Sequence, residues 1–380
     1  MKPTNCLSVV IDNLPSIEAA YSEGMAVRTL FEVWRRIDSF FGSEIETSEI
    51  EPWGITLHFT DEHGFSFVRR LEDLLSYIST TPVGVGKNKL IVAVSIRSSR
   101  SDESLGSAKL DVEQYLEDMR TAIAAYSSLS DGKIIFAEQN IVSVNQSHAP
   151  LYKECLVRIE DADGNVIMPG AFLPAVERLG LMRPIDRQVV RSVMDELRRR
   201  PDVILGCNVS GMSVSNDLWW HSILRDLRHD PQLARRLVIE ITETLLPPNL
   251  DSALELVTAL RATGCRVAVD DFGAGYSTIA FARSASPDIV KVDGSFMREL
   301  NTGLSRPDLL EHLVMLASHF APHVVVEGVE TEADFLVAKR SGANWCQGYL
   351  FTPPALLGVR NKQVNTTLIS RKLSEMKMID

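Results

Sequence analysis

The sequence has 380 residues, of which 45% are hydrophobic and 23% are charged. These values are typical of globular proteins and exclude a disordered, collagenous or coiled-coil chain. The length is enough for two domains with hydrophobic cores, so neither disulfides nor metal ions are needed for folding. The formal net charge of -11 opposes broad binding to nucleic-acid phosphates, and the sequence has no recognisable DNA-binding motif.

The five cysteines indicate a reducing compartment. Their number is odd, and they form no CxxC pair and no zinc-ligand spacing, so we interpret them as small core residues of a cytoplasmic protein. The first apolar run, from Leu7 to Ile11, is too short for a secretory signal. No run of 18 apolar residues occurs, and we therefore expect no membrane-spanning segment.

The first part of the chain, residues 1–130, predicts a small α/β domain. Apolar runs predict strands at 7–11, 54–59 and 90–96, and helical periodicity predicts helices at 25–41, 65–79 and 111–127. In the first helix, one apolar stripe is predicted from Val27, Leu30, Phe31, Trp34 and Phe41. The polar segment 97–107 is predicted to be a loop, and 127–133 a linker.

Residues 131–360 alternate between predicted strands and helices, and a tail follows at 361–380. Strands are predicted at 134–142, 153–159, 203–209, 237–242, 266–270, 289–292, 323–327 and 345–347. Helices are predicted at 185–199, 250–263 and 308–317. Beyond Pro354 we expect a helix or a partly frayed end. About eight strand–helix units are typical of a closed TIM-like (β/α)8 barrel.

Polar side chains stand at the ends of most of these strands. In a barrel the carboxyl ends of the strands form the active face, so we expect these side chains to meet at one mouth. The residues concerned are Glu154, Asn208, Glu240, Asp270, Asp271, Lys291, Glu327 and Gln347. Their coincidence at strand ends is unusual for residues with purely structural roles.

Several of these residues also have a structural interpretation. Asp270 and Asp271 precede a segment with two glycines and are suited to capping a turn, and Glu240 is compatible with an exposed strand face. However, Asp270 directly follows a buried apolar run, where an unpaired carboxylate is costly and a bound cation would compensate. Lys291 is predicted to point to the barrel interior or its mouth, where it needs a carboxylate partner.

Two further pairs of residues also have structural interpretations. Glu154 and Arg158, taken alone, fit a charged pair on a strand surface. Thr331 and Asp334 have the spacing of a helix capping box, which explains those two residues but leaves Glu327 unexplained.

The ligand types favour hard cations. About six oxygen ligands and no cluster of histidine or cysteine select Mg²⁺ or Mn²⁺ over zinc. Two adjacent aspartates can bridge a pair of such ions, an arrangement used for in-line displacement at phosphorus. Phosphodiester hydrolysis is therefore the predicted class of reaction.

The order and spacing of these motifs resemble the EAL family of cyclic di-GMP phosphodiesterases over about residues 134–354. Cys155 stands where the family usually has alanine and Asn140 where it usually has proline, and neither position supplies a ligand. The matching segments are Glu154-Cys155-Leu156 with Val157-Arg158, Cys207-Asn208-Val209-Ser210, Glu240-Ile241-Thr242-Glu243, Asp270-Asp271-Phe272-Gly273-Ala274-Gly275-Tyr276-Ser277, Lys291-Val292-Asp293, Glu327-Gly328-Val329-Glu330 and Gln347-Gly348-Tyr349.

The resemblance implies an enzyme that hydrolyses cyclic di-GMP to linear pGpG with two Mg²⁺ or Mn²⁺ ions. It also implies a barrel whose first strand runs antiparallel to the others. The implied metal ligands are Glu154, Asn208, Glu240, Asp270 and Asp271.

The same resemblance implies roles for further side chains. Lys291 and Glu327 are implied to position and deprotonate the attacking water, and Glu243 to hold the loop that follows Asp271. The implied substrate contacts are Arg158, Gln347, Gln139 and Asp293.

The first domain more distantly resembles a GGDEF diguanylate cyclase domain that has lost its site. Its Val94-Ser95-Ile96 corresponds to the SIG segment of that family. The signature hairpin corresponds to Glu51-Pro52-Trp53-Gly54-Ile55, which has no acidic pair and no Gly-Gly turn. A regulatory or dimerisation module is predicted, and an unrelated α/β domain remains the alternative.

We therefore predict a cytoplasmic phosphodiesterase that acts on cyclic di-GMP, dimerises through its barrel and binds neither nucleic acid nor membrane. A regulatory protein bound through the N-terminal domain is a further expected partner. The alternative is a catalytically silent receptor that binds cyclic di-GMP and signals through a protein partner. The presence of Glu327 and Lys291 favours the enzyme, because a receptor has no need to activate water.

Overall fold

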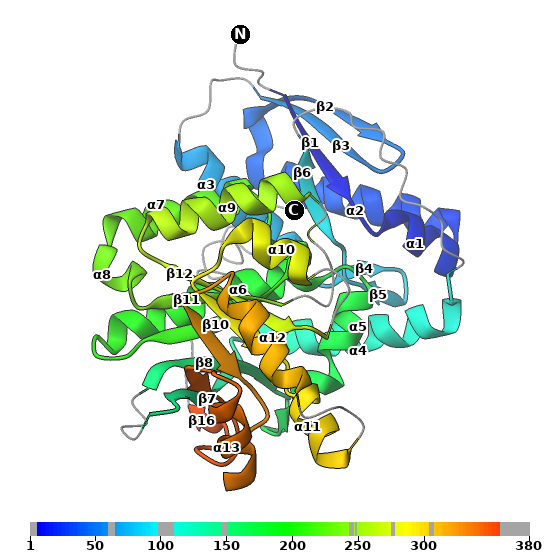
Figure 1. Ribbon diagram of the computed structural model, residues 1–380. Coiled ribbons are helices and arrows are strands. Elements are labelled where there is room, and N and C mark those ends of the chain that lie inside the picture. Colours follow the sequence, from blue (N-terminus) through cyan, green and yellow to red (C-terminus); the bar gives the residue numbers. More distant parts are fainter. Residues whose placement is uncertain are drawn as a thin grey trace. The chain divides into compact units, whose positions relative to one another are not determined.

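The computed structural model describes residues 6–59, 65–97, 110–145, 150–242, 247, 249–274, 278–303 and 308–357 (Figure 1). The chain divides into two compact units. The first contains residues 6–134 and 159–184, and the second contains residues 135–158 and 185–357, as far as these are described. Each unit is described by itself below.

The first unit contains a four-stranded antiparallel sheet in the order β2, β3, β1, β6. The strands are β1 (Cys6–Ile11), β2 (Ile45–Glu51), β3 (Gly54–Phe59) and β6 (Val94–Arg97). A short hairpin is formed by β4 (Val83–Val85) and β5 (Asn88–Leu90). The helices of residues 6–134 are α1 (Leu14–Ala20), α2 (Glu23–Phe41), α3 (Phe65–Thr80) and α4 (Val112–Ser130), with a 3-10 turn at Gly42–Glu44. The three predicted helices are confirmed.

Two predicted elements of this unit differ from the structure. The strand predicted at 90–96 is interrupted, because Asn13 accepts a hydrogen bond from the backbone N–H of Ala93 (2.9 Å) and donates one to the carbonyl of Ile91 (3.0 Å). These contacts occupy backbone groups that a continuous ladder would need. The linker predicted at 127–133 is shorter, since α4 continues to Ser130. The loop predicted at 97–107 lies outside the described residues except for Arg97, which ends β6.

The apolar stripe predicted for α2 is partly wrong. Leu30 and Phe41 are buried, but Val27 and Phe31 are 60% and 53% exposed. Successive helical residues are roughly 100° apart, so Phe31 cannot share the centre of the face that Leu30 buries. The buried side of α2 is instead formed by Met25, Ala26, Thr29, Leu30, Val33, Ile37 and Phe41.

The second unit contains an eight-stranded barrel, and the predicted TIM-like fold is confirmed. The ring order is β7, β15, β14, β13, β12, β11, β10, β8, and a pairing between β7 and β8 closes it. Neighbouring ring strands pair in parallel from β8 and β10 through to β15, whereas β7 is antiparallel to β15, as the resemblance implied. The strands are β7 (Ile134–Ser143), β8 (Pro150–Glu160), β10 (Leu205–Ser210), β11 (Leu237–Thr242), β12 (Arg266–Phe272), β13 (Ile289–Val292), β14 (His323–Val326) and β15 (Trp345–Cys346).

Two short strands extend this sheet. β9 (Val166–Ile167) pairs with β8, and β16 (Ala355–Leu357) pairs with β7. The helix or frayed end predicted beyond Pro354 therefore begins as a strand, and the rest of that tail lies outside the described residues. The helices that follow α4 are α5 (Leu173–Arg178), α6 (Met182–Arg199), α7 (Leu218–His229), α8 (Pro231–Ala234), α9 (Leu250–Ala262), α10 (Thr278–Ala285), α11 (Ser295–Thr302), α12 (Leu309–Ser318) and α13 (Glu332–Arg340), with 3-10 turns at Pro169–Ala171 and Gly211–Ser213.

Side chains inside the barrel form layers, because every second residue of a strand faces inward. One layer is apolar and buried and includes Tyr152, Val238, Ala268, Ile289 and Val325. Two residues further along the same strands, in the same order, are Glu154, Glu240, Asp270, Lys291 and Glu327. The apolar layer thus supports a polar layer at the carboxyl ends of the strands. Among the helices that the structure describes, none is long and apolar enough to cross a membrane.

Replacing Asp334 by alanine should destabilise the barrel, because this buried carboxylate caps α13. It accepts hydrogen bonds from the backbone N–H groups of Glu330 (3.0 Å) and Thr331 (2.9 Å) and from Asn301 Nδ2 (3.0 Å). The capping box predicted from the sequence is confirmed. We expect the free energy of unfolding to fall by about 2 kcal/mol in urea denaturation. The exposed Glu332→Ala on the same helix is the control, and an equal loss in both variants would contradict this interpretation.

Candidate functional site

Lys291 lies at the centre of the polar layer. Its Nζ atom is 2.8 Å from Glu327 Oε1, 2.9 Å from Glu240 Oε2, 3.1 Å from Glu154 Oε2 and 3.2 Å from Asp270 Oδ2. The lysine side chain is only 1% exposed. Four different strands or strand ends therefore bring one carboxylate each to a single buried ammonium group. The sequence predicted a carboxylate partner for Lys291, and the structure has four such partners.

Asp270 and Asp271 both belong to this site because β12 carries an irregularity. Val269 pairs with Val290 and Phe272 pairs with Val292, so the two aspartates together stand opposite the single residue Lys291. In a regular strand, adjacent side chains would point to opposite faces. Asp271 has a positive φ of 53°, and its backbone N–H donates a hydrogen bond to Asp270 Oδ1 (2.9 Å). The bulge thus aims two consecutive carboxylates at one end of the barrel.

Two amide side chains contact Glu154, and a third contacts one of these amides. Asn208 Nδ2 and Gln347 Nε2 each donate a hydrogen bond to its carboxylate at 2.6 Å, and Gln347 Nε2 also reaches Gln139 Oε1 (3.2 Å). Burial opposes ionisation of Glu154, but the Lys291 ammonium and these two amides outweigh burial and lower its pKa. Glu154 is therefore held as a carboxylate by Asn208 and Gln347, and Gln139 is linked to it through Gln347.

The other carboxylates of the cluster hold protons more tightly than usual. Burial, reinforced by the negative charge of Glu154, raises the pKa of Glu240 to about 8. Burial and the neighbouring Asp270 raise the pKa of Asp271 to about 7. Burial disfavours the charged form of Lys291, yet the carboxylates outweigh burial and raise its pKa well above the usual range. One ammonium group is insufficient to neutralise this many buried carboxylates, so the site has an affinity for additional positive charge.

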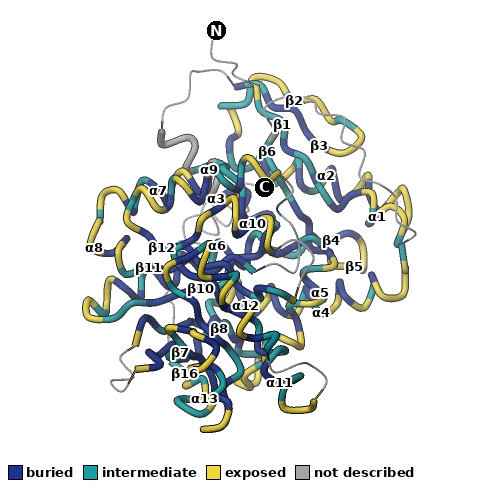
Figure 2. Tube along the Cα trace, viewed as in Figure 1, coloured by how far each residue is buried: buried dark blue, intermediate teal, exposed yellow. Residues whose placement is uncertain are grey.

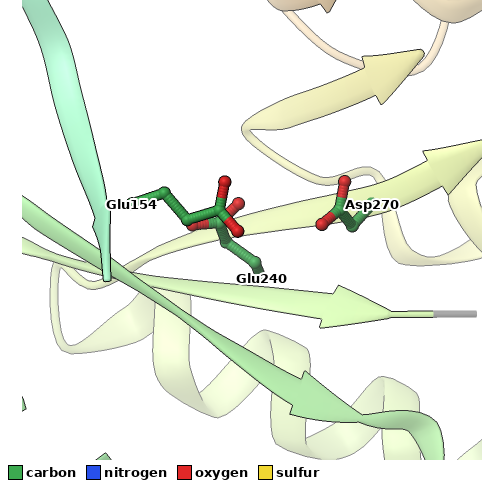
Figure 3. A group of neighbouring side chains, drawn as sticks. All are labelled: Glu154, Glu240 and Asp270. Carbon is green, nitrogen blue, oxygen red and sulfur yellow. The ribbon is translucent and has the colours of Figure 1, made fainter. Parts of the chain in front are cut away.

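The same side chains have the arrangement of a cation site. Glu154, Glu240 and Asp270 each offer a carboxylate oxygen within 4.8 Å of the others, and Asp270, Asp271 and Glu327 form a second such group. Figure 3 shows the first three side chains directed toward one another. Within the part of the chain that the structure describes, Glu240 Oε1 and Asn208 Oδ1 are buried without a hydrogen-bond partner. Unpartnered oxygen atoms of this kind, with no nitrogen or sulfur ligand beside them, fit Mg²⁺ or Mn²⁺.

The structural alternatives weighed from the sequence are resolved by burial. Glu240 is fully buried, so an exposed strand face is wrong for it. Glu154 and Arg158 are 4% and 6% exposed, which excludes a surface pair. Asp270 is buried and paired with Lys291, whereas Asp271 lies in the bulge of β12 and its carbonyl accepts a hydrogen bond from Ala274 N–H (3.1 Å) in the turn that follows.

The remaining predicted residues lie at different places. Arg158 Nη1 donates a hydrogen bond to the carbonyl of Val157 (2.8 Å), and burial lowers the pKa of its guanidinium. Asp293 accepts a hydrogen bond from the backbone N–H of Ser295 (3.0 Å) at the start of α11, and its charge contributes to the raised pKa of Asp271. Glu243 lies outside the described residues.

Gly206 is a residue that our reading of the sequence missed. It lies inside β10, two positions before Asn208, and a Cβ atom there would be 2.3 Å from Glu240 Oε1 and 2.5 Å from Tyr152 Cε2. Both distances are shorter than real Cβ contacts, so only glycine leaves room for the Glu240 carboxylate beside the tyrosine ring. A glycine in the interior of a predicted strand is itself the signal, because it weakens a strand unless another group approaches closely.

The chain belongs to the EAL domain family, whose model matches residues 120–354. The cyclic di-GMP phosphodiesterase PdeB of Shewanella oneidensis is 26% identical over 254 residues, which is 66% of this chain and 30% of PdeB. The solved structure of the PaMucR phosphodiesterase in complex with c-di-GMP is similar with a TM-score of 0.53 and 27% identity, over 64% of this chain and 97% of that one.

A third similarity extends over more of the chain. The structure of the S helix-GGDEF-EAL part of Vibrio cholerae LapD, bound to c-di-GMP, matches with a TM-score of 0.56 over 91% of this chain and 89% of that one. At 15% identity this likeness concerns the fold alone. The chain spans about a third of the length of the curated relatives it matches.

Replacing Gly206 by alanine should weaken binding of a divalent cation, because the new methyl group displaces the Glu240 carboxylate. We expect the Mn²⁺ affinity measured by calorimetry to fall about 10–100-fold, the range for losing the support of a ligand. Gly84→Ala is the matched control, since a Cβ there meets nothing within 4 Å. An unchanged affinity in a folded Gly206→Ala variant would contradict the role of this glycine.

Proposed function

We propose that this chain hydrolyses cyclic di-GMP to linear pGpG with the help of two Mg²⁺ or Mn²⁺ ions. The observation that carries the proposal is the buried Lys291 with carboxylates from four strands or strand ends around it, at the active end of an EAL barrel. The name of PdeB and the c-di-GMP in the PaMucR complex support the choice of substrate.

The proposed metal ligands are Glu154, Asn208, Glu240, Asp270 and Asp271. Their oxygen atoms, their excess negative charge and the unpartnered Glu240 Oε1 and Asn208 Oδ1 support this assignment. When bound, such cations would neutralise the phosphate and favour ionisation of a nearby water. The proton affinity of Glu240 and Asp271 implies that a bound cation would replace a proton at these side chains.

Glu327 is proposed to accept the proton of the attacking water. Burial, together with the charge of Asp270, raises the pKa of Glu327 well above its usual range, although Lys291 opposes the shift. A carboxylate with a raised pKa is a stronger base once it is ionised. Lys291 contacts Glu327 Oε1, which leaves Oε2 to receive the proton and keeps the carboxylate in a fixed orientation.

The proposed substrate contacts are Arg158, Gln347, Gln139 and Asp293. Gln347 and Gln139 are hydrogen-bonded to each other, and Gln139 Nε2 also donates to the carbonyl of Thr352 (3.2 Å), so the two amides form a fixed edge beside Glu154. Glu243 is proposed to hold the loop after Asp271.

We also propose that the first unit is a degenerate GGDEF-like regulatory or dimerisation module, and that the enzyme is a cytoplasmic homodimer through the barrel. The proposed domains are 1–130, 131–360 and a tail at 361–380. The fold likeness to LapD over 91% of the chain supports this order of domains. The turn at Pro52 and Trp53 joins β2 to β3, as expected for the hairpin that would carry the GGDEF signature, and it has no acidic pair.

Incubation with cyclic di-GMP should yield pGpG in the presence of Mg²⁺ or Mn²⁺, as measured by liquid chromatography. We expect Ca²⁺ to inhibit the reaction, because its longer and looser coordination misplaces the attacking water. Exhaustive chelation should abolish turnover, and adding back Mn²⁺ should restore it. Full activity after chelation would refute the metal-dependent reaction.

Glu327→Gln should abolish turnover and preserve substrate binding. The amide has nearly the same shape but cannot accept a proton, so we expect kcat to fall about 10²–10⁴-fold. Binding of cyclic di-GMP is measured by calorimetry with Ca²⁺ present, and the exposed Glu332→Gln serves as the control. A variant as fast as the parent would exclude Glu327 as the base, and a parent that binds but never cleaves would be a receptor.

A further inference from the structure

The first unit has an apolar face on α2 and β2 that is open to solvent. Val27 and Phe31 of α2 are 60% and 53% exposed, and Ile50 and Trp53 are 51% and 60% exposed. Large apolar side chains that gather on one surface indicate an interaction site more often than scattered ones do. Figure 2 shows exposed residues along β2.

Contacts between the two elements indicate that these side chains form one surface. Trp34 Nε1 donates a hydrogen bond to Ser48 Oγ (3.1 Å), and the rings of Phe31 and Trp34 are 5.2 Å apart. The short turn Gly42–Glu44 joins α2 to β2, so the two elements run in opposite directions. The part of α2 that precedes Trp34 therefore runs alongside the part of β2 that follows Ser48, which includes Ile50. Val27, Phe31, Trp34, Ile50 and Trp53 are called the α2–β2 face below.

This face borders a free sheet edge. β2 is the outermost strand of its sheet, so among the described residues one of its sides has no neighbouring strand. Glu51 and Gly54 flank a two-residue turn and form its hydrogen-bonded pair, and such pairs alternate with non-hydrogen-bonded ones. The backbone groups of Ile50, which pairs with Ile55, therefore point to the free side. An extended segment can add to such an edge by backbone hydrogen bonds.

The charges of β2 select the occupant. Glu46 and Glu49 are exposed, and β2 contains no basic residue. A second copy of β2 in antiparallel pairing would bring the glutamates of the two copies opposite or diagonal to each other, which is unfavourable. Lysine or arginine side chains are the complementary partners.

We propose that β2 binds an extended segment of a partner protein in which basic and apolar residues alternate. The basic residues pair with Glu49 on the face of β2 opposite Ile50, and the apolar residues lie on the Ile50 side and cover the α2–β2 face. The added strand extends the sheet of the first unit by one. This inference names a surface for a partner of the first unit and does not depend on the activity proposed for the barrel.

The probe for this proposal is a fluorescein-labelled nine-residue peptide of alternating lysine and valine, titrated with the full chain and followed by fluorescence anisotropy. We expect saturable binding, and none with a peptide of alternating glutamate and valine. Glu49→Lys should weaken binding about threefold, as expected for reversing one cross-strand charge pair. Glu18→Lys changes the net charge equally at an exposed site elsewhere in the unit and should leave binding unchanged.

Two further measurements separate strand addition from simple charge attraction. Phe31→Ser with Trp53→Ser leaves the glutamates in place and should also weaken binding, and both residues are exposed enough for the fold to tolerate the change. Peptides N-methylated either at every valine or at every lysine lose the donors of one edge each, and one of the two should fail to bind.

Three outcomes would overturn the proposal. The first is no binding of the lysine–valine peptide, and the second is equal weakening in the control variant Glu18→Lys. The third is a dimer in analytical ultracentrifugation that dissociates when Phe31 and Trp53 are replaced, because a second copy would then occupy the face.

Discussion

The buried ammonium group of Lys291 is the interaction on which the candidate site depends. It is close to Glu154, Glu240, Asp270 and Glu327, which reach it from different strands. Without a cation among them these carboxylates would repel one another in a region of low dielectric constant. One lysine compensates only part of their negative charge. The carboxylate charge that is not compensated contributes, together with burial, to the raised pKa values of Glu240 and Asp271. The site therefore keeps an excess of negative charge, which favours binding of an additional cation.

The layers of side chains inside the barrel support this concentration of charge. The apolar layer with Tyr152 and Ala268 excludes water beneath the carboxylates and holds the strands in register. Gly206 leaves the volume that the Glu240 carboxylate occupies. Gly328, with a φ of +70°, lets the loop after β14 approach Gly294 in the loop after β13, where a Cβ would lie 3.0 Å from the Gly294 Cα. Small residues thus determine the geometry of the charged ones.

In the first unit, the feature that we propose to be functional lies on the surface and not in a buried cluster. Its helices and strands bury an ordinary core, but α2 exposes Val27 and Phe31 beside the acidic edge strand β2. The proposed partner strand would bury this second apolar face of α2.

The sequence by itself determined the strand–helix alternation, the capping box at Thr331 and Asp334, and the acidic strand ends, because these depend on local periodicity and residue type. It did not determine which face of α2 is buried, since this helix has apolar residues at helical spacing on more than one side. It also did not indicate that Asp270 and Asp271 share one side of a strand, because a bulge depends on pairing with β13. The encounter of Lys291 with four carboxylates was likewise decided by the tertiary structure, because only closure of the barrel brings residues 154, 240, 270, 291 and 327 within hydrogen-bonding distance.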